Sequence, residues 1–462
     1  MNADAFWLPP GCPVTLATRE ERVGDLALRW PVVGPGDVRA VAAYLRERQA
    51  AVLARRSIDD IARVLDRAAA MWLEETEPLR RLALPAISAV TGFSEPMVAH
   101  AIDLEQRSSR RPDLLGALDR ELGDHRALDG FVQTVGGRTR AFGPALVGGI
   151  FSANIPALPH LTVLRSFLVK AACLGRVSRG EPVYLPLYAE SLHAIDADLA
   201  SCLAVLHWPS DDRDVEASFL ESIDHLIAYG GDRALRDLRS RLPDGVGSTW
   251  HGHRMGFAYV GRDVTDLDAV ADAVAYDFTV FDQHACLAPQ ACYVDRAVGL
   301  DAFAESVAAA MERWLEKLPP RRIAPAEAAV LRSARDDLEL REAMGEPVRV
   351  LTPRNRLQGT VAVIPADALV PTPLDRSCRI VPVDGEDELI RCLEPVRRYL
   401  QCAAVAGVSD DVRERLAALG VTRLCAPGLM GTPSMLWAHD GQPCLGRLVR
   451  WCDEESRAPP LL

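Results

Sequence analysis

The sequence contains 462 residues, of which 49% are hydrophobic and 25% are charged, and its formal net charge is −12. The length allows two or three domains, and the composition is ordinary for a globular protein. Because nucleic acids and anionic membranes would repel this charge, neither is an expected partner.

The cysteine pattern and the first residues predict a cytoplasmic protein without a metal site. Eleven cysteines are scattered along the chain, with no CxxC pair and no His/Cys group at zinc spacing, which is typical of a reducing compartment. Met1 to Asp4 lack the basic start and the apolar segment of a signal peptide. The charge-free stretch 141–164 is interrupted by Asn154 and several prolines, so we expect a buried strand and a turn there and no membrane span.

The N-terminal part of the chain predicts an irregular arm followed by helices. Residues 1–35 are rich in Pro and Gly, which favours the arm. Apolar residues then recur at helical spacing in two runs within 37–76, which predicts two amphipathic helices. Ser57 is the expected N-cap of the second helix, and Ser94 caps a further helical segment that ends near residue 107.

From residue 140 the pattern changes to strands that alternate with helices. The predicted strands lie at 145–151, 176–178, 204–208, 225–229 and 256–260, and the predicted helices at 160–173, 182–202, 218–223 and 232–242. Such alternation indicates βαβ units and a parallel sheet covered on both faces. Folds of this class bind nucleotides at the carboxyl ends of their strands.

A second α/β series follows a predicted helix at 269–280. Its strands are expected at 291–294, 348–351, 360–364, 379–383, 403–408 and 422–425, and its helices at 301–318, 325–344, 387–402 and 410–419. The sequence therefore predicts an α/β protein in four parts. These are an N-terminal arm with a helical extension (1–135), a nucleotide-binding α/β domain (136–275), a catalytic α/β domain (276–430) and a C-terminal arm (431–462).

Cys286 lies in the segment that joins the predicted helix at 269–280 to the strand at 291–294, shortly before Pro289. At such a junction backbone N–H groups can point at developing negative charge, as a nucleophilic thiol acting on a carbonyl requires. A single Cys is more often a small core residue. The assignment therefore depends on the other segments.

Three further segments carry candidate polar groups. Gly230 and Gly231 join a strand to a helix and would let a cofactor phosphate approach the helix N-terminus, although glycine pairs also form plain turns. The amide of Asn154 either forms a turn or donates to an oxyanion. His251 and His253 flank a Gly without a neighbouring carboxylate, which favours acid–base chemistry or hydrogen bonding over metal binding.

Taken in order, these segments resemble the aldehyde dehydrogenase superfamily, and most of all its acyl-CoA reductase branch, which includes the long-chain fatty acyl reductase of bacterial luminescence systems. The resemblance runs from about residue 140 to 455. Its segments are the strand-then-Asn-x-Pro motif ending at Pro156, the ribose-contacting segment Gly175 to Pro182, the strand–Gly turn Ile227 to Arg233, the nucleophile segment Phe281 to Gln290, and the tail from Trp437 to Gly441. Within that tail, His439 and Asp440 indicate a tight turn with a surface pair rather than a catalytic dyad.

The resemblance implies a Rossmann-type cofactor domain and a second α/β domain that carries Cys286 as the nucleophile. Asn154 and the Cys286 backbone N–H would stabilise the oxyanion, and His251 or His253 would act as general acid or base. The cofactor would be NADPH, or else NADH. The residues implied to bind it are Ser152, Arg176, Ser178, Arg179, Gly230 and Gly231. The two arginines of this set give a 2′-phosphate a charged partner.

Two departures from the family pattern bear on the reaction. Arg176 stands where Lys is common, which keeps the charge but changes its geometry. The Glu that activates water in hydrolytic members is missing, because no Asp or Glu occurs from Thr249 to Gly261. A thioacyl-enzyme without this base survives long enough to be reduced. The departure therefore favours reduction of a thioester over oxidation of an aldehyde to an acid.

We therefore expect an NAD(P)H-dependent reductase that converts an acyl-CoA or acyl-carrier-protein thioester to an aldehyde through a thioacyl group on Cys286. It would form a homo-oligomer and work with an acyl-transfer partner protein. Three alternatives stay open: an aldehyde dehydrogenase working in the oxidative direction, a non-catalytic homologue that serves as a scaffold in an acyl-transfer complex, and an acyltransferase that passes the acyl group on without reduction.

Overall fold

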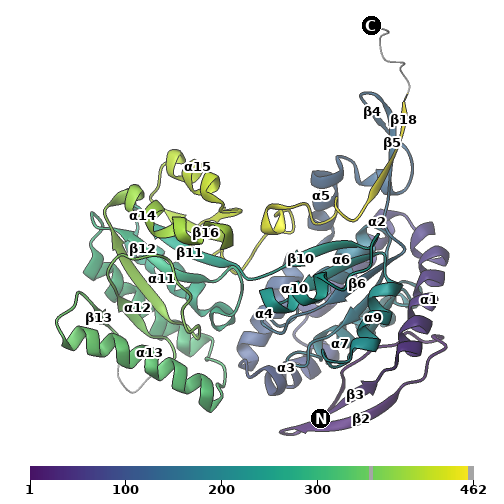
Figure 1. Ribbon diagram of the computed structural model, residues 1–462, viewed down its shortest axis with the longest axis horizontal. Coiled ribbons are helices and arrows are strands. Elements are labelled where there is room, and N and C mark those ends of the chain that lie inside the picture. Colours follow the sequence, from purple (N-terminus) through teal and green to yellow (C-terminus); the bar gives the residue numbers. More distant parts are fainter. Residues whose placement is uncertain (353–356, 456–462) are drawn as a thin grey trace. The chain divides into compact units, whose positions relative to one another are not determined.

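The computed structural model describes residues 1–352 and 357–455 (Figure 1). The chain forms two compact units. Unit 1 comprises Met1–Thr91, Ala101–Gly252 and the segment from Ser434 onward, and unit 2 comprises Gly92–His100 and His253–Pro433. Among the described residues no single helix is long and apolar enough to cross a membrane, and only the bent pair α3 (Pro78–Thr91) and α4 (Glu95–Arg107) reaches that length and composition together.

Unit 1 is built on a five-stranded parallel sheet in the order β10-β9-β6-β7-β8. Its strands are β6 (Leu146–Ile150), β7 (Ala172–Arg176), β8 (Leu203–Leu206), β9 (His225–Tyr229) and β10 (Gly247–His251). The chain runs outward from β6 to β8 and then returns to the other side of β6 as β9 and β10. The strand order therefore reverses between β6 and β9, which is where sheets of this kind bind their ligands.

Helices cover the sheet of unit 1 on both faces (Figure 1). The crossover helices α6 (His160–Leu168) and α7 (Tyr184–Ile195) pack with α2 (Ile58–Leu73), while α1 (Pro35–Ala51) packs on α9 (Arg213–Ser222) and on β7. The Ser57 hydroxyl accepts the N–H of Asp60 and so caps α2, which confirms that prediction. The remaining helices of this unit are α3, the part of α4 from Ala101 onward, α5 (Arg111–Leu122), α8 (Ala197–Ala200) and α10 (Asp232–Arg239), with short turns at Leu53–Arg55 and His125–Leu128.

The prediction of an irregular arm over residues 1–35 is wrong. This segment forms a three-stranded sheet from β1 (Asn2–Asp4), β2 (Ala17–Val23) and β3 (Leu26–Val32), and Trp7 bridges to the edge strand β8. Leu26, Leu28 and Trp30 alternate with more exposed residues along β3. This period of two is the pattern of a half-buried strand.

The C-terminal tail belongs to unit 1 and ends in a strand. β18 (Arg450–Glu455) pairs antiparallel with β5 (Gly137–Phe142), which in turn pairs with β4 (Val132–Thr134). Figure 1 shows the yellow tail running beside α5 before it joins β5. The C-terminal tail is therefore held on unit 1 through β5.

Unit 2 contains a seven-stranded sheet in the order β13-β14-β15-β12-β11-β16-β17, parallel except for β13. Its strands are β11 (Met255–Val260), β12 (Pro289–Asp295), β13 (Arg349–Val350), β14 (Val361–Val363), β15 (Cys378–Val383), β16 (Leu400–Ala406) and β17 (Arg423–Cys425). Its helices are α11 (Leu267–Thr279), α12 (Leu300–Lys317), α13 (Pro325–Ala343), α14 (Gly385–Leu393) and α15 (Asp410–Leu419), with short 3-10 helices at Val280–Gln283 and Glu394–Tyr399. A further short 3-10 helix, His439–Gly441, lies in the tail of unit 1. A buried core joins the sheet to α14 and α15.

Several element boundaries differ from those predicted. The strand at 256–260 does not extend the first sheet, because β11 pairs with β12 and β16 in unit 2. The predicted helix at 160–173 ends at Leu168, and Cys173 already belongs to β7. The predicted helix at 387–402 stops at Leu393, and Cys402 lies in β16. In both cases the apolar residues of a buried strand continue the helical pattern. Periodicity alone therefore cannot locate the boundary between the helix and the strand. The four-part domain division stays a prediction.

Candidate active site

Cys286 lies in a turn at the amino end of β12. The N–H of Ala288 donates to the carbonyl of Ala285 at 3.0 Å, which closes the turn around the thiol. Cys286 itself is half-buried. The helix α11 precedes this turn and β12 follows it, as the sequence predicted for this segment.

The backbone immediately before Cys286 is left-handed over three successive residues. Phe281, Asp282 and Gln283 have φ values of 54°, 49° and 67°. Residues other than Gly rarely adopt this conformation, and each one costs of the order of 1 kcal/mol or more. A second left-handed run occurs at 374–376, with φ values of 66°, 52° and 65°. Strained backbone of this kind persists only where the surrounding contacts determine it.

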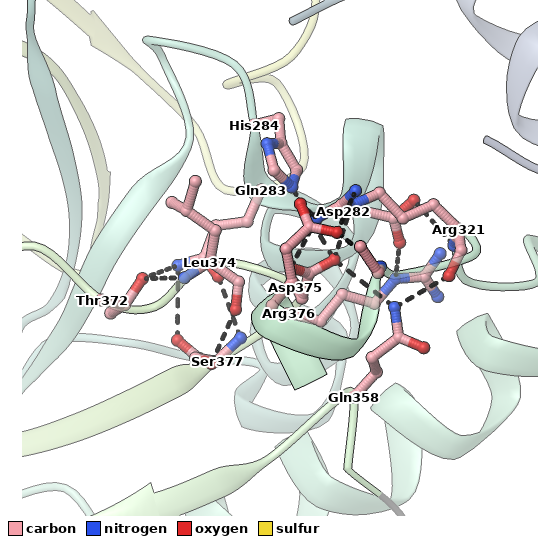
Figure 2. Close-up of polar contacts among 12 residues, drawn as sticks. Asp282, Gln283, His284, Arg321, Gln358, Thr372, Leu374, Asp375, Arg376 and Ser377 are labelled. Atoms are coloured by element: carbon pink, nitrogen blue, oxygen red, sulfur yellow. Dashed lines mark hydrogen bonds and ion pairs between the residues drawn. The ribbon is translucent and has the colours of Figure 1, made fainter. Parts of the chain in front are cut away.

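A buried ion pair joins the two left-handed runs (Figure 2). Asp282 Oδ1 accepts a hydrogen bond from Arg376 Nε at 2.6 Å, and both side chains are fully buried. The carbonyl of Asp282 also accepts the N–H of Asp375 at 3.1 Å. Burial raises the pKa of Asp282 and lowers the pKa of Arg376, and the ion pair opposes both shifts. We infer that both groups are charged and hold the two runs together.

The side chain of Gln283 supplies a second set of links. Its Nε2 donates to the carbonyl of Pro289 at 2.7 Å and to Thr372 Oγ1 at 3.0 Å. Its Oε1 accepts the N–H of Ser377 at 2.9 Å. Because Pro289 follows the Cys286 turn, Gln283 ties both ends of that turn to the segment 372–377.

Asp375 extends the network toward His284, as Figure 2 shows. Its Oδ1 lies 3.7 Å from His284 Nε2 and accepts from Arg321 Nε at 2.8 Å. Burial acts to raise the pKa of Asp375, but the nearby His284 ring and the hydrogen bonds from Arg321 outweigh it and lower the pKa. The carboxyl therefore stays ionised beside Arg321 and His284, and His284 is two residues before Cys286.

Several other cysteines are expected to be poorer nucleophiles than Cys286. Burial raises the pKa of Cys173, Cys202, Cys292 and Cys378, so their thiols stay protonated and are poor nucleophiles. Cys292 is a useful reference, because it lies in β12 close to Cys286 in sequence and is fully buried.

In unit 1, the residues that follow the parallel strands share the carboxyl edge of the sheet. Asn154 follows β6, and the Ser152 hydroxyl donates to Asn154 Oδ1 at 2.5 Å. Because the carbonyl oxygen of the amide accepts this bond, Nδ2 is the donor end of the side chain. This orientation suits a donor to an oxyanion. Ser152, which was predicted to bind a cofactor, is placed as the partner of Asn154.

The segment after β7 packs against the loop that carries Asn154. A Cβ added to Gly180 would lie 2.7 Å from the Cβ of Ala153, so only glycine allows this approach. Arg176 donates through Nε and Nη2 to the carbonyl of Trp208 at 3.2 and 2.9 Å. The Ser178 hydroxyl accepts the N–H of Gly180 at 3.2 Å. These contacts fix the segment at the carboxyl edge.

Arg179 is more exposed than Arg176. It forms an ion pair with Glu21 at 2.7 Å, and its guanidinium lies 5.6 Å from the centre of the Trp30 ring. Both partners belong to the N-terminal sheet, which the sequence prediction missed. The N-terminal sheet therefore contributes to the surroundings of a predicted cofactor residue.

Gly230 and Gly231 form the turn between β9 and α10, as predicted. Gly231 is the N-cap of α10 and provides no side-chain cap. A Cβ added to Gly231 would meet no heavy atom within 4 Å, so the space in front of the helix is open. The first N–H groups of a helix favour a phosphate, and the missing side chain allows a close approach.

His251 has a buried carboxylate partner that the sequence analysis did not identify. It ends β10, and its Nδ1 lies 2.8 Å from Asp440 Oδ2. The side chains of His251 and Asp440 are only 7% and 5% exposed. The interpretation of His439 and Asp440 as a surface pair is therefore wrong, although the predicted tight turn is present. The two partners are 189 residues apart in sequence, so no local pattern could have revealed them.

His253, the other histidine of this segment, has different surroundings. It belongs to unit 2, is exposed, and packs edge-on against Tyr399 with ring centres 5.7 Å apart. The structure therefore separates two histidines that the sequence left equivalent. His251 is the buried one with an oriented ring. The catalytic and cofactor assignments stay predictions at this point.

Comparison with known families and proteins identifies relatives over most of the chain. The family model described as acyl-CoA reductase (LuxC) matches residues 53–451. Long-chain acyl-protein thioester reductase 2 of Photobacterium leiognathi is 23% identical over 443 residues, covering 95% of this chain and 89% of the relative. The long-chain acyl-protein thioester reductase of Vibrio harveyi is 23% identical over 407 residues, covering 86% and 83%.

Solved structures with the same fold are aldehyde dehydrogenases and related enzymes. An Escherichia coli NADP-dependent enzyme superimposes with a TM-score of 0.72 at 14% identity, covering 94% of both chains. A C291A mutant of aldehyde dehydrogenase C from Pseudomonas syringae, in complex with NAD+ and octanal, gives a TM-score of 0.69 at 16% identity, covering all of this chain and 98% of the other. These similarities confirm the predicted aldehyde-dehydrogenase-like α/β fold.

Proposed function

Because the chain belongs to the acyl-CoA reductase (LuxC) family, we propose that it reduces an acyl thioester to an aldehyde through a thioacyl group on Cys286. The observation that carries this proposal is the Cys286 turn. Within the family match, a half-buried thiol is held between α11 and β12 by strained backbone and a buried ion pair. A site that fixes a thiol in this way is expected of covalent catalysis.

The first chemical step is acyl transfer to Cys286. The thiolate attacks the thioester carbonyl, the new carbon–sulfur bond forms, and the thiol of the acyl donor leaves. We assign Asn154 Nδ2 and the Cys286 backbone N–H to the oxyanion, where each donor lowers the barrier by about 3 kcal/mol. Support for Asn154 comes from Ser152, which orients its amide. We assign His251 as the general acid or base of this step, because its ring is buried and paired with Asp440.

The carboxyl edge of unit 1 fits a nicotinamide dinucleotide. Gly231 leaves the N-terminus of α10 open to a phosphate, and the segment from Arg176 to Gly180 is fixed beside the Asn154 loop. A reduced nicotinamide would supply a hydride to the thioacyl carbon. We propose NADPH as the preferred form, with Arg179 as the partner of the 2′-phosphate, because Arg179 is exposed and would exchange its ion pair with Glu21 for the phosphate, whereas Arg176 is half-buried against the carbonyl of Trp208.

The names of the relatives refer to acyl-protein thioesters, while the family description refers to acyl-CoA. We propose that an acyl-protein or acyl-CoA thioester serves as donor, with an acyl-transfer protein as partner. We further propose a cytoplasmic homo-oligomer. The exposed edge strand β18 supports association between copies, because unpaired edge strands pair readily with other chains.

Anaerobic mixing with a panel of acyl thioesters and NADPH tests the proposal. Loss of nicotinamide absorbance matched by aldehyde supports it. Aldehyde oxidation that does not require a thiol acceptor would instead support an oxidative dehydrogenase. Acyl transfer to an amine or thiol without nicotinamide consumption would support the acyltransferase. A protein that neither binds acyl groups nor consumes nicotinamide would be a scaffold.

A further inference from the structure

We propose that Arg19, on strand β2 of the N-terminal sheet, binds the adenosine 2′-phosphate of NADPH together with Arg179. This inference rests on the proposed function, which assigns the 2′-phosphate to Arg179, and it identifies a second residue that recognises the same group. All residues of the argument belong to unit 1. The family match begins at residue 53, so β1, β2 and β3 lie outside it.

The pairing of β2 with β3 places Arg19 directly opposite Trp30. Opposite residues of an antiparallel pair carry their side chains on the same face of the sheet, and so do residues two apart along one strand. Arg19, Glu21 and Trp30 therefore share a face, while Arg22 lies on the other face of β2. The Arg19 guanidinium lies 5.9 Å from the centre of the Trp30 ring.

Arg179 reaches the same ring from the segment after β7. Its guanidinium lies 5.6 Å from the centre of the Trp30 ring, and its Nη2 donates to Glu21 Oε1 at 2.7 Å. Trp30 is only 2% exposed, so its indole has a fixed position and attracts both guanidinium groups through its π-system. One buried ring therefore gathers two arginines from separate parts of the chain.

These residues lie at the carboxyl end of β8. His207 directly follows β8, and its ring packs on Trp30 with centres 4.4 Å apart. Trp7 exchanges two backbone hydrogen bonds of 2.8 Å with Val205 on the same strand. The N-terminal sheet is thus held against the edge of the parallel sheet. Sheets of this class bind their nucleotides at this edge.

Positive charge is concentrated around His207. Burial lowers the pKa of His207 to about 4, and Arg176, Arg179 and Arg19 act in the same direction. The imidazole is therefore neutral at physiological pH, and three guanidinium groups lie near enough to act on it. Such a concentration of guanidinium groups attracts a phosphate dianion.

Arg19 differs from the other two arginines because no carboxylate is paired with it. Arg179 pairs with Glu21, while burial lowers the pKa of Arg176 and the charge of Glu216 opposes this shift. Within residues 1–352 and 357–455, Arg19 forms no ion pair. Its guanidinium is exposed, and its planar fork can donate two hydrogen bonds to one phosphate.

The proposed reaction involves two adenosine phosphates of similar chemistry, the 2′-phosphate of NADPH and the 3′-phosphate of CoA. We assign the arginines to NADPH, because Arg179 follows β7 at the edge of the sheet that fits the dinucleotide. Glu21 would favour the other nicotinamide cofactor, since a carboxylate accepts the 2′-hydroxyl of NADH. Its ion pair with Arg179 must therefore open when the phosphate binds.

The test is isothermal titration calorimetry of the full chain with three probes: 2′,5′-ADP, 3′,5′-ADP and 5′-AMP. The variants are Arg19→Ala, Arg19→Lys, and the double variant that also carries Arg179→Ala. Arg22→Ala is the matched control, because Arg22 is an exposed arginine of the same strand on the opposite face. Binding of these probes needs neither a thioester nor turnover, so it does not depend on the reaction.

We expect the wild type to bind 2′,5′-ADP more tightly than the other two probes. Arg19→Ala should weaken binding of 2′,5′-ADP about 10- to 100-fold and change that of 5′-AMP less than about twofold. Arg19→Lys should recover part of the loss, because an ammonium keeps the charge without the planar fork. The double variant should bind 2′,5′-ADP and 5′-AMP equally. Arg22→Ala should behave as the wild type.

Unchanged affinities in Arg19→Ala would overturn the inference. Equal losses for all three probes would also overturn it, because they would show that Arg19 only supports the local structure. A wild type that prefers 3′,5′-ADP would assign the arginines to CoA, and one that prefers 5′-AMP would assign Glu21 to the 2′-hydroxyl of NADH. Both results would contradict the inference.

Failure of this inference can be told apart from failure of the proposed function. Aldehyde formation with NADH, in a protein that does not prefer 2′,5′-ADP, would reject the role of Arg19 and keep the proposed reduction. The expected binding pattern in a protein that forms no aldehyde from any thioester would support the phosphate site and reject the proposed reduction.

Discussion

Asp282 and Arg376 form an ion pair in which both side chains are fully buried, although the residues are 94 positions apart in sequence. Each belongs to a run of three left-handed residues. The pair therefore fastens two strained segments to each other, and one of these segments leads directly into the Cys286 turn. The precise placement of the thiol depends on contacts that are made far from it in sequence.

Breaking this pair should destabilise unit 2. Asp282→Asn or Arg376→Met leaves one buried charge without its partner, which costs about 3–5 kcal/mol. The double variant should lose less than the sum of the two, because no unpaired charge is left. Urea unfolding measures these differences. Asp272→Asn, which removes an exposed ion pair with Arg313, should cost no more than about 1 kcal/mol. Additive losses in the double variant would contradict the account.

The two neighbouring cysteines of the site should differ in reactivity. Incubation with a labelled acyl thioester should label the wild type and Cys292→Ala, but not Cys286→Ala. Burial raises the pKa of Cys292 and keeps it protonated. Peptide mapping of the labelled protein locates the acyl group. Label that persists in Cys286→Ala would remove this residue from the mechanism.

Asp277 should make stability depend on pH. Burial raises its pKa to about 7, although the N–H groups of Gly428 and Met430 donate to it and lower the value. A carboxyl with a raised pKa in the folded state loses its contribution to stability as pH rises from about 4 to about 7. Across this window, the unfolding free energy of Asp277→Asn should rise relative to that of the wild type by about 1.4 kcal/mol per pH unit.

Chemical unfolding at a series of pH values checks this slope. Asp410→Asn, at an exposed position in the first turn of α15, controls for the loss of one negative charge. A difference between Asp277→Asn and the wild type that stays constant with pH would contradict the expectation.

Arg179 should discriminate between the two nicotinamide cofactors. Losing a charge-assisted bond to the 2′-phosphate costs about 1.5–3 kcal/mol, so Arg179→Ala should raise the KM for NADPH at least about tenfold and leave that for NADH unchanged. Glu21→Gln removes the ion pair that competes for Arg179 and should lower the KM for NADPH. Equal effects on both cofactors would argue against a phosphate contact.

Helices and strands that depend on residues close together in sequence were predictable. The Ser57 cap and the apolar face of α2 are neighbours in sequence, and the segment from α11 through Cys286 to β12 also follows from local spacing. The strand β3 could have been found too, because the large apolar residues Leu26, Leu28 and Trp30 occupy every second position. The glycines and prolines around it hid this pattern.

The contacts that orient the candidate site were not predictable from one sequence. Asp440 meets His251 across 189 residues, and Arg376 meets Asp282 across 94. Periodicity and capping describe interactions within a few residues, so they carry no information on which distant side chain fills a buried position. Both pairs depend on the tertiary fold, and both involve left-handed backbone that no residue type signals.

Reduction of the isolated acyl-enzyme tests the central claim most directly. The protein is acylated with a labelled thioester, freed of excess donor, and mixed anaerobically with NADPH. The account predicts that the label leaves the protein as aldehyde, in an amount equal to the nicotinamide oxidised, and that the Cys286 thiol becomes reactive again. Label that stays on the protein, or leaves as free acid without nicotinamide oxidation, would contradict it.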